Sequence, residues 1–352
     1  MVKKCAGRRP NSQPHKETIM KTQAKAFVLC AATLMVSCLP AIAAPQADWK
    51  FFTYFAANDK PTLLHKAFAE DVTKASQGRL NIQVYASGEL PYKASDVLRA
   101  VARNQVQIGD VAFGFVAGDV PQLNALSMPF SCTSIDKFYD KAAPAMEKDI
   151  NDVLGGKFKT QSIMQWVMPP QQLWLVKPID DIEGLKGLKV RAWNREQVDM
   201  MAALGGAGVT VTPAEVIPSL QRKVVDGAFT AAVPALDWKF NEVTKMGYML
   251  NLTLAHQAMV VNQKALQGLP DDLQKLLADK AAEWAPKYRA AMIEADRDAR
   301  RQLQEKGMTL QDVSSADMEK LRAATRPIGE AWAAKNGDLA AKMLAGAIDA
   351  CR

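Results

Sequence analysis

Histidine is scarce in this chain, with only three copies in 352 residues. His15, His65 and His256 stand far apart, and none has cysteines or paired carboxylates at the spacing of metal ligands. Zinc and iron sites take most of their ligands from such clusters. The sequence therefore predicts no metal site. We expect His65 at the surface or boundary of a helix and a structural role for His256.

The motifs of several common catalytic sites are missing as well. There is no G-x-S-x-G nucleophile elbow and no G-x-x-x-x-G-K-[ST] phosphate loop. Gly205, Gly206 and Gly208 lack the G-x-G-x-x-G spacing of a dinucleotide-binding turn and suit the end of a helix instead. We therefore expect neither an enzyme nor a cofactor.

The N-terminus has the pattern of an export signal. Lys21 and Lys25 precede an apolar run over residues 26–42, and the small-residue pattern at its end predicts cleavage before Ala44. These features predict a signal peptide over residues 1–43 and a periplasmic protein. No later apolar run approaches the length of a membrane span.

Most of the excess positive charge belongs to this signal. The whole chain has 44 Lys and Arg against 37 Asp and Glu, whereas the residues after position 43 have 37 against 36. The part of the chain after the signal is therefore nearly neutral, and its composition does not favour a nucleic-acid partner. The polar, basic residues 1–19 are unlike the start of a signal peptide, so translation begins at either Met1 or Met20.

Only two cysteines follow the signal, Cys132 and Cys351. In an oxidising compartment they either form one disulfide that ties the end of the chain to its first half, or remain two unrelated buried thiols. The sequence leaves both alternatives open.

Strand-like and helix-like segments alternate from Trp49 onward, which favours an α/β fold with largely parallel sheets. The alternation restarts near residue 170, so we expect two lobes joined by crossing strands. Residues 271–306 favour a long helix, which must span both lobes or bend at Pro286. We place lobe I at 44–169 plus about 256–296, and lobe II at 170–255 plus about 297–352. Strands are expected at 49–56, 79–86, 106–115, 171–179, 187–193, 208–212 and 224–233.

Arg191 interrupts an otherwise apolar strand pattern, "GLKVRAW". Alternation puts Val190 and Ala192 on one face and Arg191 on the other, near the carboxyl end of the strand. Asn194 is placed to cap the helix that follows. Ligands of open α/β sheets bind beyond strand ends, where a guanidinium can match a carboxylate. An internal pair with Glu215 or Asp226 explains Arg191 equally well from spacing alone.

The stretch "PIDDIEGLKGLKVRAWNREQVDMMAALGGAGVTVTPAEVIPSLQRKVVDG", residues 178–227, resembles the core motif of solute-binding proteins of tripartite ATP-independent periplasmic (TRAP) transporters, the dicarboxylate-binding subunit family. Residues 77–101, 108–130 and 261–277 are similar to the same family in the same order. The resemblance implies a two-lobe periplasmic solute-binding fold, type II-like, with a long helix across both lobes. It also implies closure around an organic acid and delivery of that acid to a TRAP membrane permease.

The resemblance also assigns residues. Arg191 stands where the family clamps a carboxylate, and Asn194 where members often place another ligand hydrogen bond. This chain departs from the pattern in lacking a second arginine near Gln171 and in carrying Ala228, Phe229 and Thr230 in place of polar groups. We therefore expect a monocarboxylate with an apolar or aromatic body. The expected ligand-binding residues are Arg191, Asn194, Trp193, Trp174, Gln171, Thr230, Phe229 and Trp238 on one side, and Tyr92, Lys93 and Phe115 opposite them.

Two other functions fit the same features. An exported ligand sensor would present the same bound form to a receptor. A carboxylate-processing enzyme would use Arg191 to orient its substrate, although the sequence shows no catalytic set of residues to accompany it.

Overall fold

The computed structural model describes residues 47–352. The signal peptide expected over residues 1–43 lies outside this range. Within it, no helix is both long enough and apolar enough to cross a membrane.

The first sheet has five strands in the order β2-β1-β3-β10-β4. β1 pairs in parallel with β2 and β3, whereas β10 runs antiparallel to both of its neighbours, β3 and β4. The strands are β1 (Ala47–Phe52), β2 (Leu80–Tyr85), β3 (Ile108–Ala112), β4 (Thr160–Met168) and β10 (Ala255–Asn262).

The second sheet has six strands in the order β11-β9-β5-β8-β6-β7. β6 is parallel to β7 and β8, and β5 is antiparallel to β8 and β9. Each sheet is therefore mixed, with one reversed strand, rather than fully parallel. The strands are β5 (Gln172–Leu175), β6 (Lys189–Ala192), β7 (Ala207–Thr210), β8 (Gly227–Thr230), β9 (Met246–Met249) and β11 (Thr309–Asp312).

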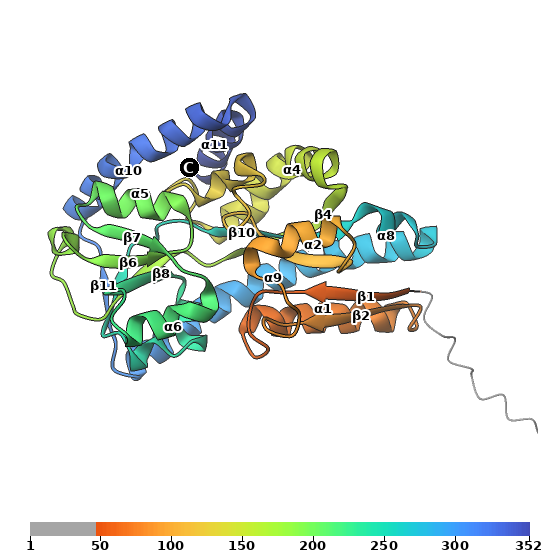
Figure 1. Cartoon of the computed structure of the whole chain (residues 1–352), viewed down its shortest axis with the longest axis horizontal. Helices are drawn as coiled ribbons and strands as arrows, with labels where there is room; N and C mark the ends of the chain where they lie inside the picture. The colour runs from red at the N-terminus through yellow and green to blue at the C-terminus, as the bar shows by residue number, and fades with distance from the viewer. Residues whose placement is uncertain (1–46) are drawn as a thin grey trace, which may run out of the picture. The chain divides into compact units, whose positions relative to one another are not determined.

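Helices cover both sheets and connect their strands (Figure 1). We call the first sheet with α1, α2 and α4 the first half, and the second sheet with α5, α6 and α7 the second half. The helices are α1 (Lys60–Ala75), α2 (Val97–Ala102), α3 (Ile135–Lys137), α4 (Ala143–Phe158), α5 (Arg195–Ala203), α6 (Pro213–Gln221), α7 (Ala232–Asp237), α8 (Gln263–Gln267), α9 (Asp271–Glu305), α10 (Ser315–Asn336) and α11 (Asp338–Cys351).

Neighbouring side chains of a strand point to opposite faces of the sheet, and in the first half both faces are buried. Phe51 belongs to the buried cluster that includes Phe68 of α1 and Tyr288 of α9. Phe52, the next residue, belongs to a second cluster with Val101 of α2 and Leu154 of α4. The sheet is therefore sandwiched between two helical layers.

The reversed strands, β5 and β10, are the ones that the chain enters when it crosses from one sheet to the other. β4 ends in the first sheet at Met168, and β5 begins in the second at Gln172. The return path runs from β9, which ends at Met249, to β10, which begins at Ala255. The expected strand crossings between two α/β units are therefore present, and they lie beside one another at the junction of the halves.

The third connection is α9, a helix of 35 residues that continues without interruption through Pro286. At 1.5 Å per residue it is about 52 Å long. It packs against α1 and β4 of the first half and against α7 and β11 of the second half. The expectation of one long helix across both α/β units is confirmed.

The last helix lies elsewhere than expected. We placed residues from about 297 to 352 with lobe II, but α11 packs against the segments Pro121–Ser127 and Phe138–Ala142, which belong to the first half of the chain. A disulfide between Cys132 and Cys351 joins the same two regions, with their Cα atoms 5.2 Å apart. The buried side chains of α11, Leu344 among them, complete a core cluster of the first half.

Candidate functional site

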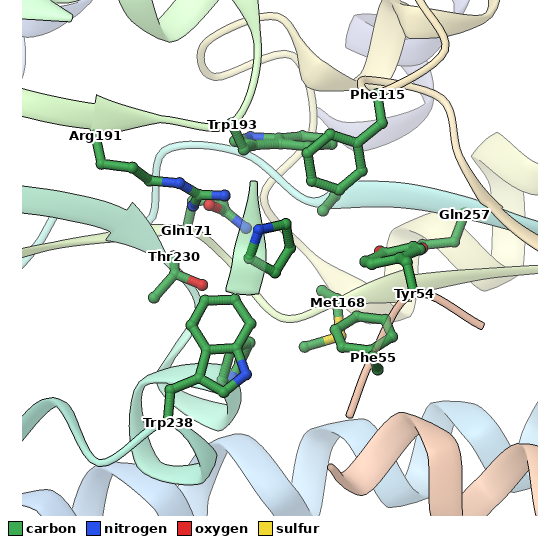
Figure 2. Close-up of a pocket in the computed structure, with 13 residues that line it drawn as sticks. Tyr54, Phe55, Phe115, Met168, Gln171, Arg191, Trp193, Thr230, Trp238 and Gln257 are labelled. Atoms are coloured by element: carbon green, nitrogen blue, oxygen red, sulfur yellow. The ribbon is translucent and has the colours of Figure 1, made fainter. Parts of the chain in front are cut away.

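A cavity lies between the two sheets, and most of its wall is apolar (Figure 2). Five polar side chains interrupt that wall, and only one of them carries a charge at neutral pH. The lining residues are Phe55, Phe115, Met168, Trp193, Pro213, Pro234, Trp238 and Ala255, with the polar side chains Tyr54, Gln171, Arg191, Thr230 and Gln257.

The carboxyl ends of strands from both sheets deliver several of these residues to the cavity. Tyr54 and Phe55 follow β1, and Phe115 follows β3. From the second sheet, Arg191 lies near the end of β6 and Thr230 is the last residue of β8. This is the place where open α/β sheets bind their ligands.

Arg191 is held by the backbone of its own sheet. Its Nε donates to the carbonyl oxygen of Val211 at 2.9 Å, and its Nη1 donates to that of Phe229 at 2.7 Å. The side chain is only 2 % exposed, and burial lowers the pKa of its guanidinium to about 9. Arg191 therefore remains a cation at neutral pH, oriented by two carbonyl groups whose dipoles do not cancel its charge.

Neither of the internal acids considered for Arg191 pairs with it. The carboxylate of Asp226 accepts a hydrogen bond from the backbone N–H of Lys189 at 2.9 Å, and that of Glu215 accepts one from the Thr212 hydroxyl at 3.3 Å. Within residues 47–352, no carboxylate forms an ion pair with Arg191. A buried charge without a counter-ion is costly, so the site favours an anion from outside.

Tyr54 and Gln257 form a polar pair on the opposite side of the cavity. The Tyr54 hydroxyl donates to Oε1 of Gln257 at 2.7 Å. Burial raises the pKa of Tyr54 well above its usual value, with a further increase from Asp110, so the phenol stays protonated. The phenol oxygen can still accept a hydrogen bond, and the Gln257 amide nitrogen can still donate.

Gln171 brings a buried amide to the same cavity, and Figure 2 shows it beside Arg191. Its side chain is almost wholly buried, and its Oε1 has no hydrogen-bond partner among residues 47–352. A buried acceptor left unpaired costs about 1–3 kcal/mol. The geometry therefore provides an acceptor for an N–H or O–H group that enters the cavity.

Aromatic rings form much of the remaining wall. Phe115 lies edge-on to Trp193, with the ring centroids 5.5 Å apart, and edge-on to Tyr54 at 5.3 Å. The indole N–H of Trp238 donates to Oδ2 of Asp59 at 3.2 Å. Trp193 and Trp238 belong to the second half and Phe115 and Asp59 to the first, so the Phe115–Trp193 and Asp59–Trp238 contacts join the two halves.

Six of the residues expected from the sequence line the cavity. The structure brings them together from five separate segments of the chain, and Figure 2 labels all of them. They are Arg191, Trp193, Gln171, Thr230, Trp238 and Phe115.

Three expected residues of the second half do not line the cavity. The Asn194 side chain caps α5, accepting from the backbone N–H of Gln197 at 3.0 Å. Trp174 is fully buried in the core, where its indole N–H donates to the Thr230 carbonyl at 2.9 Å. The ring of Phe229 is also buried in the core, and only its carbonyl contributes, as an acceptor for Arg191.

Two of the three expected opposing residues of the first half, Tyr92 and Lys93, also lie away from the cavity. Tyr92 packs edge-on against Phe52, with the ring centroids 5.7 Å apart. Lys93 is exposed and precedes the short helix Ala94–Asp96, where its backbone N–H donates to Asp96 at 2.9 Å. The loop that carries Tyr92 and Lys93 does not reach the cavity, and Tyr54 instead lies opposite Arg191.

Sequence reasoning missed several lining residues, above all Tyr54, Phe55 and Gln257. We took residues 49–56 as one strand, but β1 ends at Phe52, which makes Tyr54 and Phe55 strand-end residues. An earlier strand end was the signal that would have identified them. Gln257 lies in β10, a strand that the sequence analysis did not predict. The other missed residues are Met168, Pro213, Pro234 and Ala255.

His65 does not lie at a surface or boundary, because it is fully buried. Its Nε2 lies 3.0 Å from Asp110 and its Nδ1 lies 2.6 Å from the Tyr288 hydroxyl. The same carboxylate accepts from Thr53 and Trp166, so these groups satisfy one another beneath the cavity. Within residues 47–352, no group of three or more His, Cys, Asp or Glu side chains could hold a metal ion.

A cavity at the strand ends of two sheets, with one buried cation and mostly apolar walls, is the site of a protein that binds small organic molecules. Residues 52–336 match the family described as bacterial extracellular solute-binding protein, family 7, and the chain belongs to this family. The resemblance to TRAP solute-binding proteins found in the sequence is therefore confirmed.

Individual relatives agree with this membership. The C4-dicarboxylate-binding periplasmic protein DctP of Rhodobacter capsulatus is 26% identical over 264 residues, which cover 73% of this chain and 77% of the relative. DctP6 of Bordetella pertussis, an extracytoplasmic solute receptor binding pyroglutamic acid, has a TM-score of 0.79 and 25% identity, covering 86% of this chain and 100% of its own.

A third comparison supports the fold alone. A TRAP solute-binding protein from a marine metagenome, specific for pyroglutamate and solved with the copurified ligand, has a TM-score of 0.80 and 23% identity. The match covers 87% of this chain and 99% of that one. The expected two-lobe solute-binding fold is thus confirmed.

Proposed function

We propose that this protein captures an organic carboxylate between its two halves and delivers it to a TRAP-type membrane permease. The observation that carries the proposal is the buried Arg191 guanidinium, which lines the cavity without an ion pair from residues 47–352. Its free N–H groups can donate to both oxygens of a carboxylate. Export and periplasmic action follow from family membership and from the expected signal peptide.

The lining further supports a monocarboxylate with an apolar or aromatic body. Arg191 is the one charged side chain in the lining, so a second carboxylate of the ligand would have no cation to meet it. Phe55, Phe115, Trp193 and Trp238 instead offer surfaces for a ring or an alkyl group. Two of the relatives bind pyroglutamate and a third is a C4-dicarboxylate-binding protein, which supports an organic acid as the ligand. The apolar or aromatic body of that acid is proposed from the lining residues alone.

Binding without chemistry is the function that suits this site. The polar lining consists of one cation, two amides, one hydroxyl and one phenol. Burial raises the pKa of that phenol, Tyr54, which disfavours it as a base at neutral pH. Closure around a ligand shifts a solute receptor toward the form that its permease recognises, and no covalent step is needed.

Thermal shift measurements with four acids test the ligand class. We would compare pyroglutamate, phenylacetate, succinate and glucuronate on the purified protein, and identify any copurified acid by mass spectrometry. We expect pyroglutamate and phenylacetate to raise the melting temperature most. If only the dicarboxylate succinate or the polyhydroxylated glucuronate raises it, the proposal of a monocarboxylate with an apolar or aromatic body is wrong.

Uptake measurements test the delivery step. Membrane vesicles that hold the permease should accumulate the bound acid only when this protein is added. Binding without stimulated uptake would favour the sensor, and chemical change of the acid on long incubation would favour the enzyme.

A further inference from the structure

Gly114 follows β3 and separates Phe113 from Phe115. Its backbone is not among those with a positive φ, so the local conformation does not require glycine. A Cβ atom at this position would lie 2.3, 2.5 and 2.9 Å from three atoms of the six-membered ring of Trp193. Position 114 is therefore glycine because the Trp193 ring occupies the space of a side chain.

The contact joins the two halves of the molecule. Gly114 comes from the strand end of β3 in the first sheet, and Trp193 follows β6 in the second. Trp193 is 4 % exposed and also rests edge-on against Phe115. Trp193 lines the cavity. The space left by the missing side chain of Gly114 therefore sets how closely Trp193 can approach the first half.

A second pair of contacts crosses at another edge of the cavity. The backbone N–H of Lys60, in the first turn of α1, donates to Oδ2 of Asp237 at 3.1 Å. The neighbouring Asp59 accepts from the Trp238 indole at 3.2 Å. The Trp193 contacts at one edge of the cavity and the Asp237 and Trp238 contacts at another edge therefore hold the two halves in one closed arrangement.

We infer that Gly114 is a closure residue, whose missing side chain lets Trp193 seat against the first half when the protein closes on its ligand. The inference rests on the proposed function, because closure has a purpose only if a ligand is captured. Packed carbon atoms rarely approach below 3.4 Å, so one methyl group at position 114 must push the ring away by about 1 Å. The two halves then cannot reach the arrangement that forms the Lys60–Asp237 contact.

A trapping experiment measures closure without any ligand. Lys60→Cys and Asp237→Cys are introduced together in the full chain, and the rate at which these two cysteines form a disulfide under a mild oxidant is followed by peptide mapping. The closed arrangement brings residues 60 and 237 together, as the 3.1 Å contact between the Lys60 N–H and Oδ2 of Asp237 shows, so a faster disulfide rate reports a larger closed population. Gly114→Ala should lower this rate on the order of tenfold, which corresponds to about 1.4 kcal/mol against closure.

Gly118→Ala is the matched control, because Gly118 lies in the same loop and a Cβ there meets nothing within 4 Å. It should leave the trapping rate unchanged. Trp193→Leu removes the ring atoms that clash, so adding it to Gly114→Ala should restore the rate. This rescue separates a closure role from simple misfolding, as does an unchanged melting temperature of the ligand-free Gly114→Ala variant.

Equal trapping rates for the original residue and for Gly114→Ala would overturn the inference, as would a loss that Trp193→Leu does not rescue. The thermal shift test of the ligand class can fail without affecting the trapping test of Gly114. If none of the four acids binds but Gly114→Ala still slows trapping, the closure role stands and the proposed ligand class falls.

Discussion

Arg191 donates from Nη1 to the backbone carbonyl of Phe229, 2.7 Å away on the neighbouring strand. A second bond from Nε to the carbonyl of Val211 fixes the plane of the guanidinium. The fold itself therefore holds this cation in place, and no acidic side chain of residues 47–352 neutralises it. A site built in this way keeps both its orientation and its charge for a ligand.

Arg191→Lys tests the carboxylate clamp. Lysine keeps the charge but loses the planar fork, so it cannot bond to the two carbonyls and to both oxygens of a carboxylate together. We expect the protein to fold and its affinity for the bound acid to fall on the order of 100-fold. Titration calorimetry measures the loss, and Arg195→Lys, an exposed arginine paired with Asp199, serves as control. Unchanged affinity in Arg191→Lys would contradict the clamp.

Gln171→Met tests the unpaired acceptor. The substitution keeps the length of the side chain but removes Oε1, which has no partner within residues 47–352. If the ligand donates to it, affinity should fall on the order of tenfold while ligand-free stability is unchanged or higher.

The adjacent Gln172 provides the contrast for that test. Its side chain is fully buried and bonds to the Pro170 carbonyl and to Asn251. Gln172→Met should therefore lower the free energy of unfolding by about 1–3 kcal/mol and leave affinity unchanged. Equal affinities of the two methionine variants would argue against a ligand bond to Gln171.

Asp237 should make ligand affinity depend on pH. Burial raises its pKa to about 6, with a contribution from Asp59, while the N–H and charge of Lys60 oppose the shift. The buried carboxyl of the closed form keeps its proton up to about pH 6, whereas an exposed aspartate loses it near pH 3.9. Closure is therefore easiest at low pH, is increasingly opposed as pH rises from about 4 to 6, and changes little above pH 6. We expect severalfold tighter binding at pH 5 than at pH 7.5, measured by titration calorimetry. Asp237→Asn should remove this dependence, and the exposed Asp180→Asn should not.

Local alternation was enough to place Arg191, because the charged residue and its apolar neighbours differ strongly along one strand. The same rule could not separate cavity from core at Trp174 and Phe229. Helices cover both faces of the central strands, so residues on either face are buried. Only the packing of distant segments decides which aromatic rings remain at the cavity.

Non-local pairing explains the other differences. β1 ends at Phe52, and the next residue, Thr53, bonds to the carboxylate of Asp110, 57 residues later. β10 lies between β3 and β4, which precede it by more than 80 residues. No window of a few residues contains that information, so Tyr54 and Gln257 could be assigned to the site only from the structure.

Cys351→Ser tests the role of the disulfide to Cys132. The bridge fastens α11 to the first half, and loss of a disulfide that closes so long a loop typically costs about 2–5 kcal/mol. We expect a lower midpoint of urea unfolding and, because α11 does not line the cavity, an unchanged ligand affinity. Reduction of the original protein should reproduce the effect, and an unchanged midpoint would contradict it.

His256 should weaken the fold at acidic pH. It is fully buried between Phe113 and Phe138, and burial lowers its pKa to about 3. The unfolded chain takes up a proton near pH 6.5, whereas the folded protein resists it until about pH 3. Stability from the neutral ring is therefore complete above pH 6.5 and is lost as pH falls toward 3, by about 1.4 kcal/mol per pH unit.

His256→Gln isolates this contribution, because glutamine does not titrate and can still bond to Gln165, the partner of the imidazole. Urea unfolding at pH 7 and pH 4.5 gives the loss of free energy for each protein. The original protein should lose about 2–3 kcal/mol more than the variant over this interval. Since carboxylates titrate in both proteins, only the difference between them measures the histidine, and equal losses would show that His256 is protonated in the fold.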